Sequence, residues 1–178
     1  MNYFKLILIS ILFAFILILY LNNEANKTIL GIIFDSFWIN WLVVFYVFLI
    51  HKNSNVSFSN NFYKIKKYEY SGFFYQEIGV KLFKKILVKN PLPISTAKLS
   101  LKNKSIENIN KLENQMRLAE TVHFISFVIS IFVLLFLGFL RDFRIIYFMM
   151  IFNVIINLYP FFVQRYNRSR INKILGLD

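Results

Sequence analysis

The chain has 178 residues and no cysteine, which excludes disulfides, thiolate nucleophiles and cysteine metal sites. Apolar residues make up 57% of the chain and aromatic residues 19%, and they gather in long blocks that are typical of a membrane protein rather than a globular core. The net charge is +12, but a basic chain tethered to a membrane needs no nucleic acid to explain its charge. We therefore expect contact with membrane lipids and no nucleic-acid partner.

Four apolar blocks predict transmembrane helices at about residues 4–21, 29–50, 120–140 and 144–163. Each block has about 20 residues, enough for a helix to cross a hydrocarbon core. Helices are expected because their backbone groups are satisfied internally in lipid. No small-residue cleavage site follows the first block, so we expect it to be retained rather than removed as a signal peptide. The predicted fold is an all-α integral membrane protein, with residues 1–178 forming a single membrane domain.

The distribution of basic residues predicts the orientation in the membrane. The loop formed by residues 51–119 contains thirteen Lys and Arg, and more follow in the C-terminal tail. Because basic loops stay on the cytoplasmic side, we expect this loop and both termini to be cytoplasmic. Arg141 and Arg144, in the short outer turn, oppose this orientation but are outnumbered.

The cytoplasmic loop is predicted to contain a basic amphipathic helix at residues 73–89. Its apolar residues recur every four positions: Phe74, Ile78, Leu82 and Ile86. Its lysines fall largely elsewhere on the helical wheel, which is typical of helices that lie at a membrane interface beside anionic lipid. Pro91 and Pro93 would end this helix. A second, more polar helix is expected at residues 102–119, running into the third span.

Polar residues interrupt the last two spans on one face each. Glu120 and His123, three residues apart, share a face of the third span, and Asn153, Asn157 and Gln164 lie on roughly one face of the fourth. In the predicted orientation both faces reach the inner leaflet, so we expect them to form one site. A histidine beside a carboxylate can act as a general base near neutral pH. Amide and guanidinium groups can polarise a carbonyl or hold an anion.

Each of these features also has a simpler interpretation. His123 could be an interfacial residue, and Glu120 could only begin the helix, where an acid suits the helix dipole. Asn153 and Asn157 could hold helices together. The arginine cluster that begins at Arg165 could anchor the tail, and the lysine-rich loop could be a solvated surface. The convergence of acid, imidazole, amide and guanidinium at one depth favours a site.

Three strings resemble one known family. They are Glu69-x-x-Gly72-x-x-Tyr75, Ala119-Glu120-Thr121-Val122-His123, and Asn157-Leu158 followed by Gln164-Arg165-Tyr166-Asn167-Arg168-x-Arg170. They resemble the glycosyl-diaponeurosporenoate acyltransferases, small bacterial membrane enzymes that, in staphylococci, esterify a fatty acid onto the glucose of a carotenoid glycoside. The resemblance covers about residues 65–175. The chain has Phe124 where members usually have Trp, Lys85 where they have an acid, and Tyr159 where they have Pro, so the resemblance does not fix the acceptor.

The resemblance implies a membrane acyltransferase of the bacterial cell membrane. It would move a fatty acyl group from an activated donor to a hydroxyl of a lipid-embedded glycoside, such as a glycosylated carotenoid, and we expect no cofactor and no metal. His123 would remove the hydroxyl proton, with Glu120 orienting the imidazole, and Arg165 and Arg168 would bind an anionic part of the donor. The predicted substrate-binding residues are Arg117, Asn157, Gln164, Arg165, Tyr166, Asn167 and Arg168.

Two other functions stay open at this point. The chain could be a non-enzymatic membrane subunit or scaffold whose basic loop docks a cytoplasmic partner or anionic lipid. It could also be a transferase that acts on a phospholipid or a flexirubin-type pigment. The oligomeric state is not predicted.

Overall fold

The structure is a computed structural model of the chain that describes residues 7–15, 28–54, 58–70, 72–89, 106–140 and 143–175. These residues form helices, turns and short connections, with no strand among them. They cluster into two compact units. Unit 1 is drawn from residues 1–56 and 122–158, and unit 2 from residues 57–121 and 159–178.

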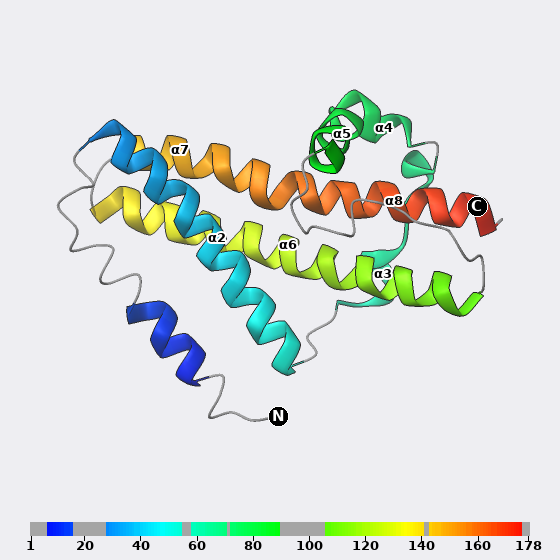
Figure 1. Cartoon of the computed structure of the whole chain (residues 1–178), viewed down its shortest axis with the longest axis horizontal. Helices are drawn as coiled ribbons and strands as arrows, with labels where there is room; N and C mark the ends of the chain where they lie inside the picture. The colour runs from blue at the N-terminus through cyan, green and yellow to red at the C-terminus, as the bar shows by residue number, and fades with distance from the viewer. Residues whose placement is uncertain are drawn as a thin grey trace. The chain divides into compact units, whose positions relative to one another are not determined.

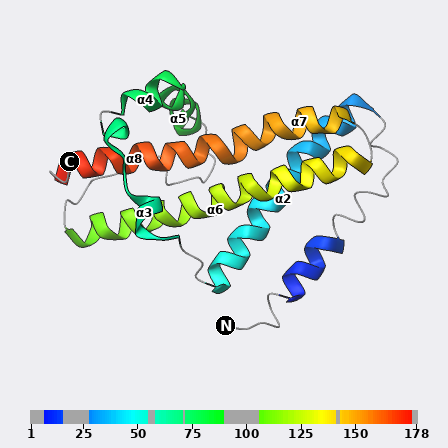
Figure 2. The same cartoon turned by 180° about the vertical axis from the view of Figure 1, so that it is seen from behind.

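Unit 1 is built around helices that carry most of the apolar sequence. Its elements are α2 (Ile29–Ser54), the second part of α6 (Ile106–Leu140), α7 (Phe143–Asn153) and the π-helical segment η4 (Val154–Leu158). Helix α2 packs against α7, as both views show (Figures 1 and 2). One buried cluster consists of Ile32, Ile39, Leu134, Leu137, Ile145 and Met149. Asn40 joins the two helices through a 3.3 Å hydrogen bond from its side chain to the Met149 carbonyl.

Unit 2 contains the loop segments and the C-terminal helix. Its elements are α3 (Asn60–Tyr63), the short 3₁₀ helix η2 (Lys67–Glu69), α4 (Phe73–Glu77), α5 (Val80–Lys89), the first part of α6, and α8 (Tyr159–Leu175). Helix α5 packs on α8 and on α4 (Figures 1 and 2). The core beneath them contains Tyr75, Val80 and Val163. A second core joins the start of α6 to the end of α8 through Ile109, Met116 and Ile171.

Three helices are long and apolar enough to cross a membrane. They are Ile29–Ser54, Asn108–Leu137 and Phe143–Lys173, with mean hydropathies of 1.9, 2.2 and 1.9. They correspond to the second, third and fourth predicted spans. Of the first predicted span, residues 7–15 are described and are helical. The ring of Phe13 in this segment stacks on Tyr46 of α2, with 4.4 Å between ring centroids.

The predicted amphipathic helix at residues 73–89 is two helices instead of one. Gly79 adopts a φ of 78°, a left-handed conformation that interrupts the helix between α4 and α5. Tyr75 and Val80 are buried, whereas Leu82 and Ile86, on the apolar face predicted to lie at a membrane interface, are 65% and 52% exposed. Their exposure is compatible with that interfacial position, which stays a prediction. The predicted end at the two prolines lies outside the described residues.

The last predicted span also differs from the structure at its C-terminal end. The apolar run ends at Val163, but the helix continues to Leu175. The polar string Gln164–Arg168 is therefore helical rather than the end of the helix. It remains buried because unit 2 supplies partners for its polar groups.

Candidate functional site

The side chains of four consecutive residues of α8 contact four separate parts of unit 2. The pairs are Arg165 with Glu69, Tyr166 with Gly72, Asn167 with Lys84, and Arg168 with Glu120. Successive side chains of an α-helix point about 100° apart, so four of them reach around the whole helix. This explains how a short string can organise η2, α4, α5 and α6 around α8.

Arg165 and Glu69 form a buried bidentate ion pair. The Arg165 Nε and Nη2 atoms donate to the two carboxylate oxygens of Glu69, each at 2.8 Å. Arg165 Nη1 and Nη2 also donate to the backbone carbonyls of Phe62 and Lys64, at 3.0 and 3.2 Å. Glu69 is 2% exposed and Arg165 7% exposed. The arginine thus fixes the backbone that leads from α3 to η2.

The protonation state of this cluster follows from its hydrogen bonds. Burial raises the pKa of the Glu69 carboxyl, but hydrogen bonds from Arg165, Tyr75 and the Lys66 amide outweigh burial and hold the pKa below its ordinary value of 4.5. Burial, followed by the hydrogen bond that the Tyr75 hydroxyl donates to Glu69, raises the pKa of Tyr75. At neutral pH the carboxylate is therefore charged and the phenol neutral, and the charge of Arg165 is compensated.

Arg168 forms a second buried ion pair, with Glu120. Its Nη1 atom donates to both carboxylate oxygens of Glu120, at 2.9 and 3.0 Å, and its Nη2 atom donates to the Tyr63 carbonyl at 2.6 Å. Arg165 Nη1 lies 3.7 Å from the same carboxylate, which links the two pairs into one network. Glu120 is 0% exposed and Arg168 2% exposed. Such buried charges are tolerated because each has a close opposite charge.

A polar pocket of 430 Å³ opens beside this network in unit 2. It is lined by Asn60, Asn61, Tyr63, Lys64, Ile65, Tyr70, Glu113, Arg117, Arg168 and Asn172. Its arginines are paired, because Arg117 binds Glu113 at 2.8 Å and Arg168 binds Glu120. The Nε donor of Arg168 has no hydrogen-bond partner among the described residues. Lys64 adds an exposed cation to the lining, and the amide and hydroxyl groups of the pocket can both donate and accept, which suits a ligand rich in hydroxyl groups.

In unit 1, His123 and Asn157 lie together. The imidazole is half-buried and lies against the Asn157 side chain and the Ile156 backbone. Asn157 donates to Asn153 Oδ1 at 2.7 Å, and Asn153 donates to the Phe127 carbonyl at 3.1 Å. The Nδ1 atom of His123 and the Oδ1 atom of Asn157 have no hydrogen-bond partner among the described residues. An imidazole nitrogen that is free of partners can accept a proton.

The neighbouring segment η4 helps to explain this arrangement. Proline has no backbone N–H, so Pro160 cannot donate to the carbonyl four residues earlier, that of Ile156. The helix is π-helical at Val154–Leu158, a segment that ends two residues before this proline. An Ile156 carbonyl without its usual helical donor can accept a hydrogen bond from an imidazole instead.

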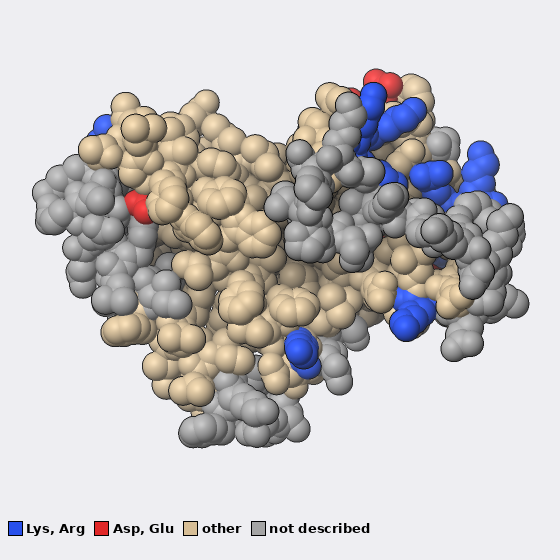
Figure 3. Space-filling view, viewed as in Figure 1, with Lys and Arg blue, Asp and Glu red and all other residues tan. Residues whose placement is uncertain are grey.

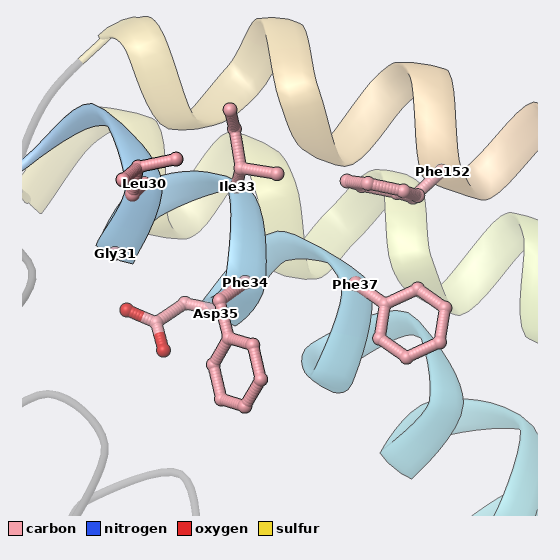
Figure 4. Close-up of a pocket in the computed structure, with 7 residues that line it drawn as sticks. All are labelled: Leu30, Gly31, Ile33, Phe34, Asp35, Phe37 and Phe152. Carbon is pink, nitrogen blue, oxygen red and sulfur yellow. The ribbon is translucent and has the colours of Figure 1, made fainter.

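Unit 1 also contains an apolar pocket of 680 Å³. It is lined by Leu30, Gly31, Ile33, Phe34, Asp35, Phe37 and Phe152. Figure 4 shows Phe152 projecting from α7 on the side of Ile33 and Phe37, whereas the carboxylate of Asp35 points away from Phe152. The pocket contains none of the predicted site residues, so it is not part of the candidate site.

The sequence model of the family described as glycosyl-4,4'-diaponeurosporenoate acyltransferase matches residues 59–177. The chain belongs to this family. The match begins immediately before α3 and runs through α8, so it includes every element of unit 2. Neither the curated proteins nor the solved structures give a match to the chain.

The structure brings the predicted acyltransferase residues together in two sets. His123 and Asn157 are in contact in unit 1, and Glu120, Arg165 and Arg168 share one network in unit 2. Also in unit 2, Arg117 borders the polar pocket, Gln164 is buried, Tyr166 packs on Gly72, and Asn167 binds Lys84. Whether the two sets form one site stays a prediction.

Sequence reasoning on individual residues missed Glu69, Tyr63 and Lys84. Glu69 belongs to a string that carried the family resemblance, and an acid within a strongly basic loop is a signal that it pairs with a distant arginine. Lys84 was hidden among several lysines. Tyr63 contributes a backbone carbonyl to Arg168 and an aromatic ring beneath Arg117 and Arg168, which no sequence pattern indicates.

Proposed function

We propose that the chain transfers a fatty acyl group from an activated donor to a hydroxyl of a lipid-embedded glycoside, such as a glycosylated carotenoid. Membership of a family of acyltransferases with a glycosylated carotenoid in its name is the observation that carries this proposal. Three helices suited to a membrane support access to a substrate dissolved in lipid. In this proposal the protein is one membrane domain of the bacterial cell membrane, with both termini on the cytoplasmic side.

His123 is the proposed general base. Its Nδ1 atom, which has no hydrogen-bond partner among the described residues, would take the proton of the acceptor hydroxyl as the hydroxyl oxygen forms the new ester bond. The bond from the acyl carbon to its leaving group then breaks, and the imidazolium returns the proton to that group. Asn157, beside the imidazole, would bind the acyl oxygen through its amide, although its Nδ2 atom now donates to Asn153.

The polar pocket is the proposed binding place for the sugar of the acceptor. Sugar hydroxyls both donate and accept hydrogen bonds, as do the pocket's Asn60, Asn61 and Asn172 side chains. The two arginines of the pocket are each paired with a glutamate and so attract an anion less than unpaired arginines would, although Lys64 also lines the pocket. In this proposal the Glu120 carboxylate acts by holding Arg168 at the pocket.

Replacement of His123 tests the proposal. Acylated glycolipid would be measured in membranes that carry His123→Ala, wild-type protein or the control His51→Ala at matched protein level. Loss of a general base lowers a rate by about 10²–10⁴-fold, so we expect a strong decrease for His123→Ala alone. His51 lies three residues before Ser54, the last residue of α2, and has no part in the proposed chemistry. Unchanged acylation in His123→Ala would refute the base assignment, and absence of acylation in the wild type with every glycoside supplied would refute the proposed function.

A further inference from the structure

Lys84 of α5 and Arg170 of α8 lie over the same aromatic ring. Their cationic groups are 5.7 and 5.8 Å from the ring centroid of Tyr166. Lys84 Nζ also donates a hydrogen bond of 2.6 Å to Asn167 Oδ1. Arg170 is exposed and Lys84 half-buried, so the pair borders solvent. Figure 3 shows Lys and Arg side chains gathered over α4, α5 and α8.

The positive charge of this pair has no opposite charge beside it in the part of the chain that the structure describes. Among the described residues, neither Lys84 nor Arg170 has a carboxylate partner. Arg165 and Arg168, five and two residues before Arg170 on α8, each bind a buried glutamate. A paired guanidinium attracts an anion weakly, whereas two cations that lie 5.7 and 5.8 Å from one ring centroid and have no carboxylate partner among the described residues attract one more strongly.

The surroundings of Lys84 are those of a site prepared for an anion. Burial, and secondly the charge of Arg170, lower the pKa of Lys84 to about 8. A bound anion would oppose both effects. Asn167 is 0% exposed, and its Nδ2 donor has no hydrogen-bond partner among the described residues. An ammonium, a guanidinium and an amide N–H are the donors that commonly bind phosphate oxygens.

We propose that Lys84, Asn167 and Arg170 bind a phosphate group. If the proposed acyl transfer is correct, on which the identity of the ligand rests, the phosphate belongs to the activated acyl donor, as in coenzyme A or a carrier-bound phosphopantetheine. The anionic part of the donor is then held by Lys84 and Arg170 rather than by Arg165 and Arg168. The headgroup of an anionic phospholipid has the same chemistry and is the other source to be tested.

Binding of coenzyme A to the full-length protein in nanodiscs of phosphatidylcholine tests the site without requiring catalysis. Loss of a hydrogen bond to a charged group weakens binding by roughly tenfold or more, so we expect Lys84→Gln and Arg170→Gln each to raise the dissociation constant by about that factor. Lys85→Gln is the matched control, because Lys85 is the exposed neighbour of Lys84 on α5. Arg117→Gln tests the polar pocket as the alternative location.

The protonation of Lys84 provides a second measurement. Reductive methylation with ¹³C keeps the charge of lysines, and the Lys84 resonance can be assigned by its absence in Lys84→Arg. We expect this resonance to titrate near pH 8 in the free protein. Coenzyme A should move the midpoint upward, because a nearby anion favours the charged lysine. Arg170→Gln should also raise the midpoint in the free protein.

The outcomes separate this proposal from the proposed function. Weakened binding in both variants and an upward midpoint support the phosphate site, whether or not His123→Ala retains acylation. The phosphate site is overturned if neither coenzyme A nor phosphatidylglycerol shifts the Lys84 midpoint, or if Lys85→Gln or Arg117→Gln weakens binding of coenzyme A equally. If nanodiscs of phosphatidylglycerol shift the Lys84 midpoint and coenzyme A in neutral nanodiscs does not, the phosphate comes from lipid and the donor assignment is overturned.

Discussion

Glu69 is the residue at which three donors of unit 2 meet. Its carboxylate accepts hydrogen bonds from Arg165, Tyr75 and the Lys66 amide. Each donor belongs to a different part of the chain, so the carboxylate holds η2, α4 and α8 together. The cost of burying its charge is offset only while Arg165 is present.

Removing one partner of this pair should therefore destabilise the protein. We expect Glu69→Gln and Arg165→Ala each to lower the free energy of unfolding by about 3–5 kcal/mol, because each leaves a buried group without its counter-charge. Thermal unfolding in detergent measures the effect. Glu77→Gln, at an exposed position on α4, is the control and should change the stability little. The pair is not important for folding if Arg165→Ala unfolds at the wild-type temperature.

The same pair predicts how stability depends on pH. The folded-state pKa of Glu69 is below its ordinary value of 4.5, so its contribution is fully present above pH 4.5 and decreases as pH falls through the folded value. Wild-type protein should lose more stability than Glu69→Gln when acidified from pH 6 to below 4.5. Parallel stability curves for the two proteins over this range would contradict the assigned ionisation.

At the scale of elements, two glycines determine how α4 and α5 are placed on α8. Gly72 and Gly79 both have positive φ, at 66° and 78°, but their surroundings differ. A Cβ at Gly72 would lie 3.0 Å from the Tyr166 ring, whereas at Gly79 the nearest atom is the Tyr159 hydroxyl oxygen at 3.7 Å. The first glycine is needed for backbone conformation and for close approach, the second for conformation alone.

The two glycines give a matched pair of substitutions. Left-handed backbone costs a residue with a Cβ about 1–2 kcal/mol, so Gly79→Ala should destabilise by about that amount. Gly72→Ala should cost more, because Tyr166 must also move. Unfolding temperatures of the two variants measure the difference. Equal loss in both would show that the contact between Gly72 and Tyr166 contributes nothing.

Pro160 allows a test of the π-helical segment. Pro160→Ala restores a backbone N–H and should raise helix stability, since proline inside a helix costs about 3 kcal/mol relative to alanine. The restored N–H would compete with His123 for the Ile156 carbonyl. We therefore expect a more stable protein with a lower rate of acyl transfer. Increased stability with an unchanged rate would show that the π-helical segment does not assist the imidazole.

At the scale of the whole molecule, both compact units use the same two long helical stretches. Residues 106–121 of α6 belong to unit 2 and residues 122–140 to unit 1, and the stretch from α7 to α8 is divided between Leu158 and Tyr159. The apolar portions thus belong mainly to unit 1, and most of the basic loop belongs to unit 2. This division agrees with a chain that is partly within lipid and partly in water.

The orientation prediction can be tested with reporter fusions. Fused after Asp178, a reporter that works only in the cytoplasm should be active, and a reporter that works only outside the membrane should be silent. The reason is that the basic residues concentrate in the loop and tail. A fusion in the turn between Leu140 and Phe143 should give the reverse pattern. The same pattern at both positions would contradict the predicted topology.

The sequence by itself determined the helical class, three of the long apolar helices and the family. The apolar helices can be predicted from the sequence because the length and apolarity of a membrane-spanning helix depend only on about 20 consecutive residues. The family follows from strings of residue types at fixed spacings. The sequence also identified the residues of the string Gln164–Arg168, since polar groups that follow an apolar run stand out.

Only the tertiary structure decided what those residues do. The sequence could not show that Arg165 and Arg168 have their charges compensated by Glu69 and Glu120, because these partners are 96 and 48 residues away. For the same reason it could not distinguish Lys84 from the other lysines of the loop. The charge available to a ligand depends on which opposite charges lie within a few ångströms, and folding sets those distances.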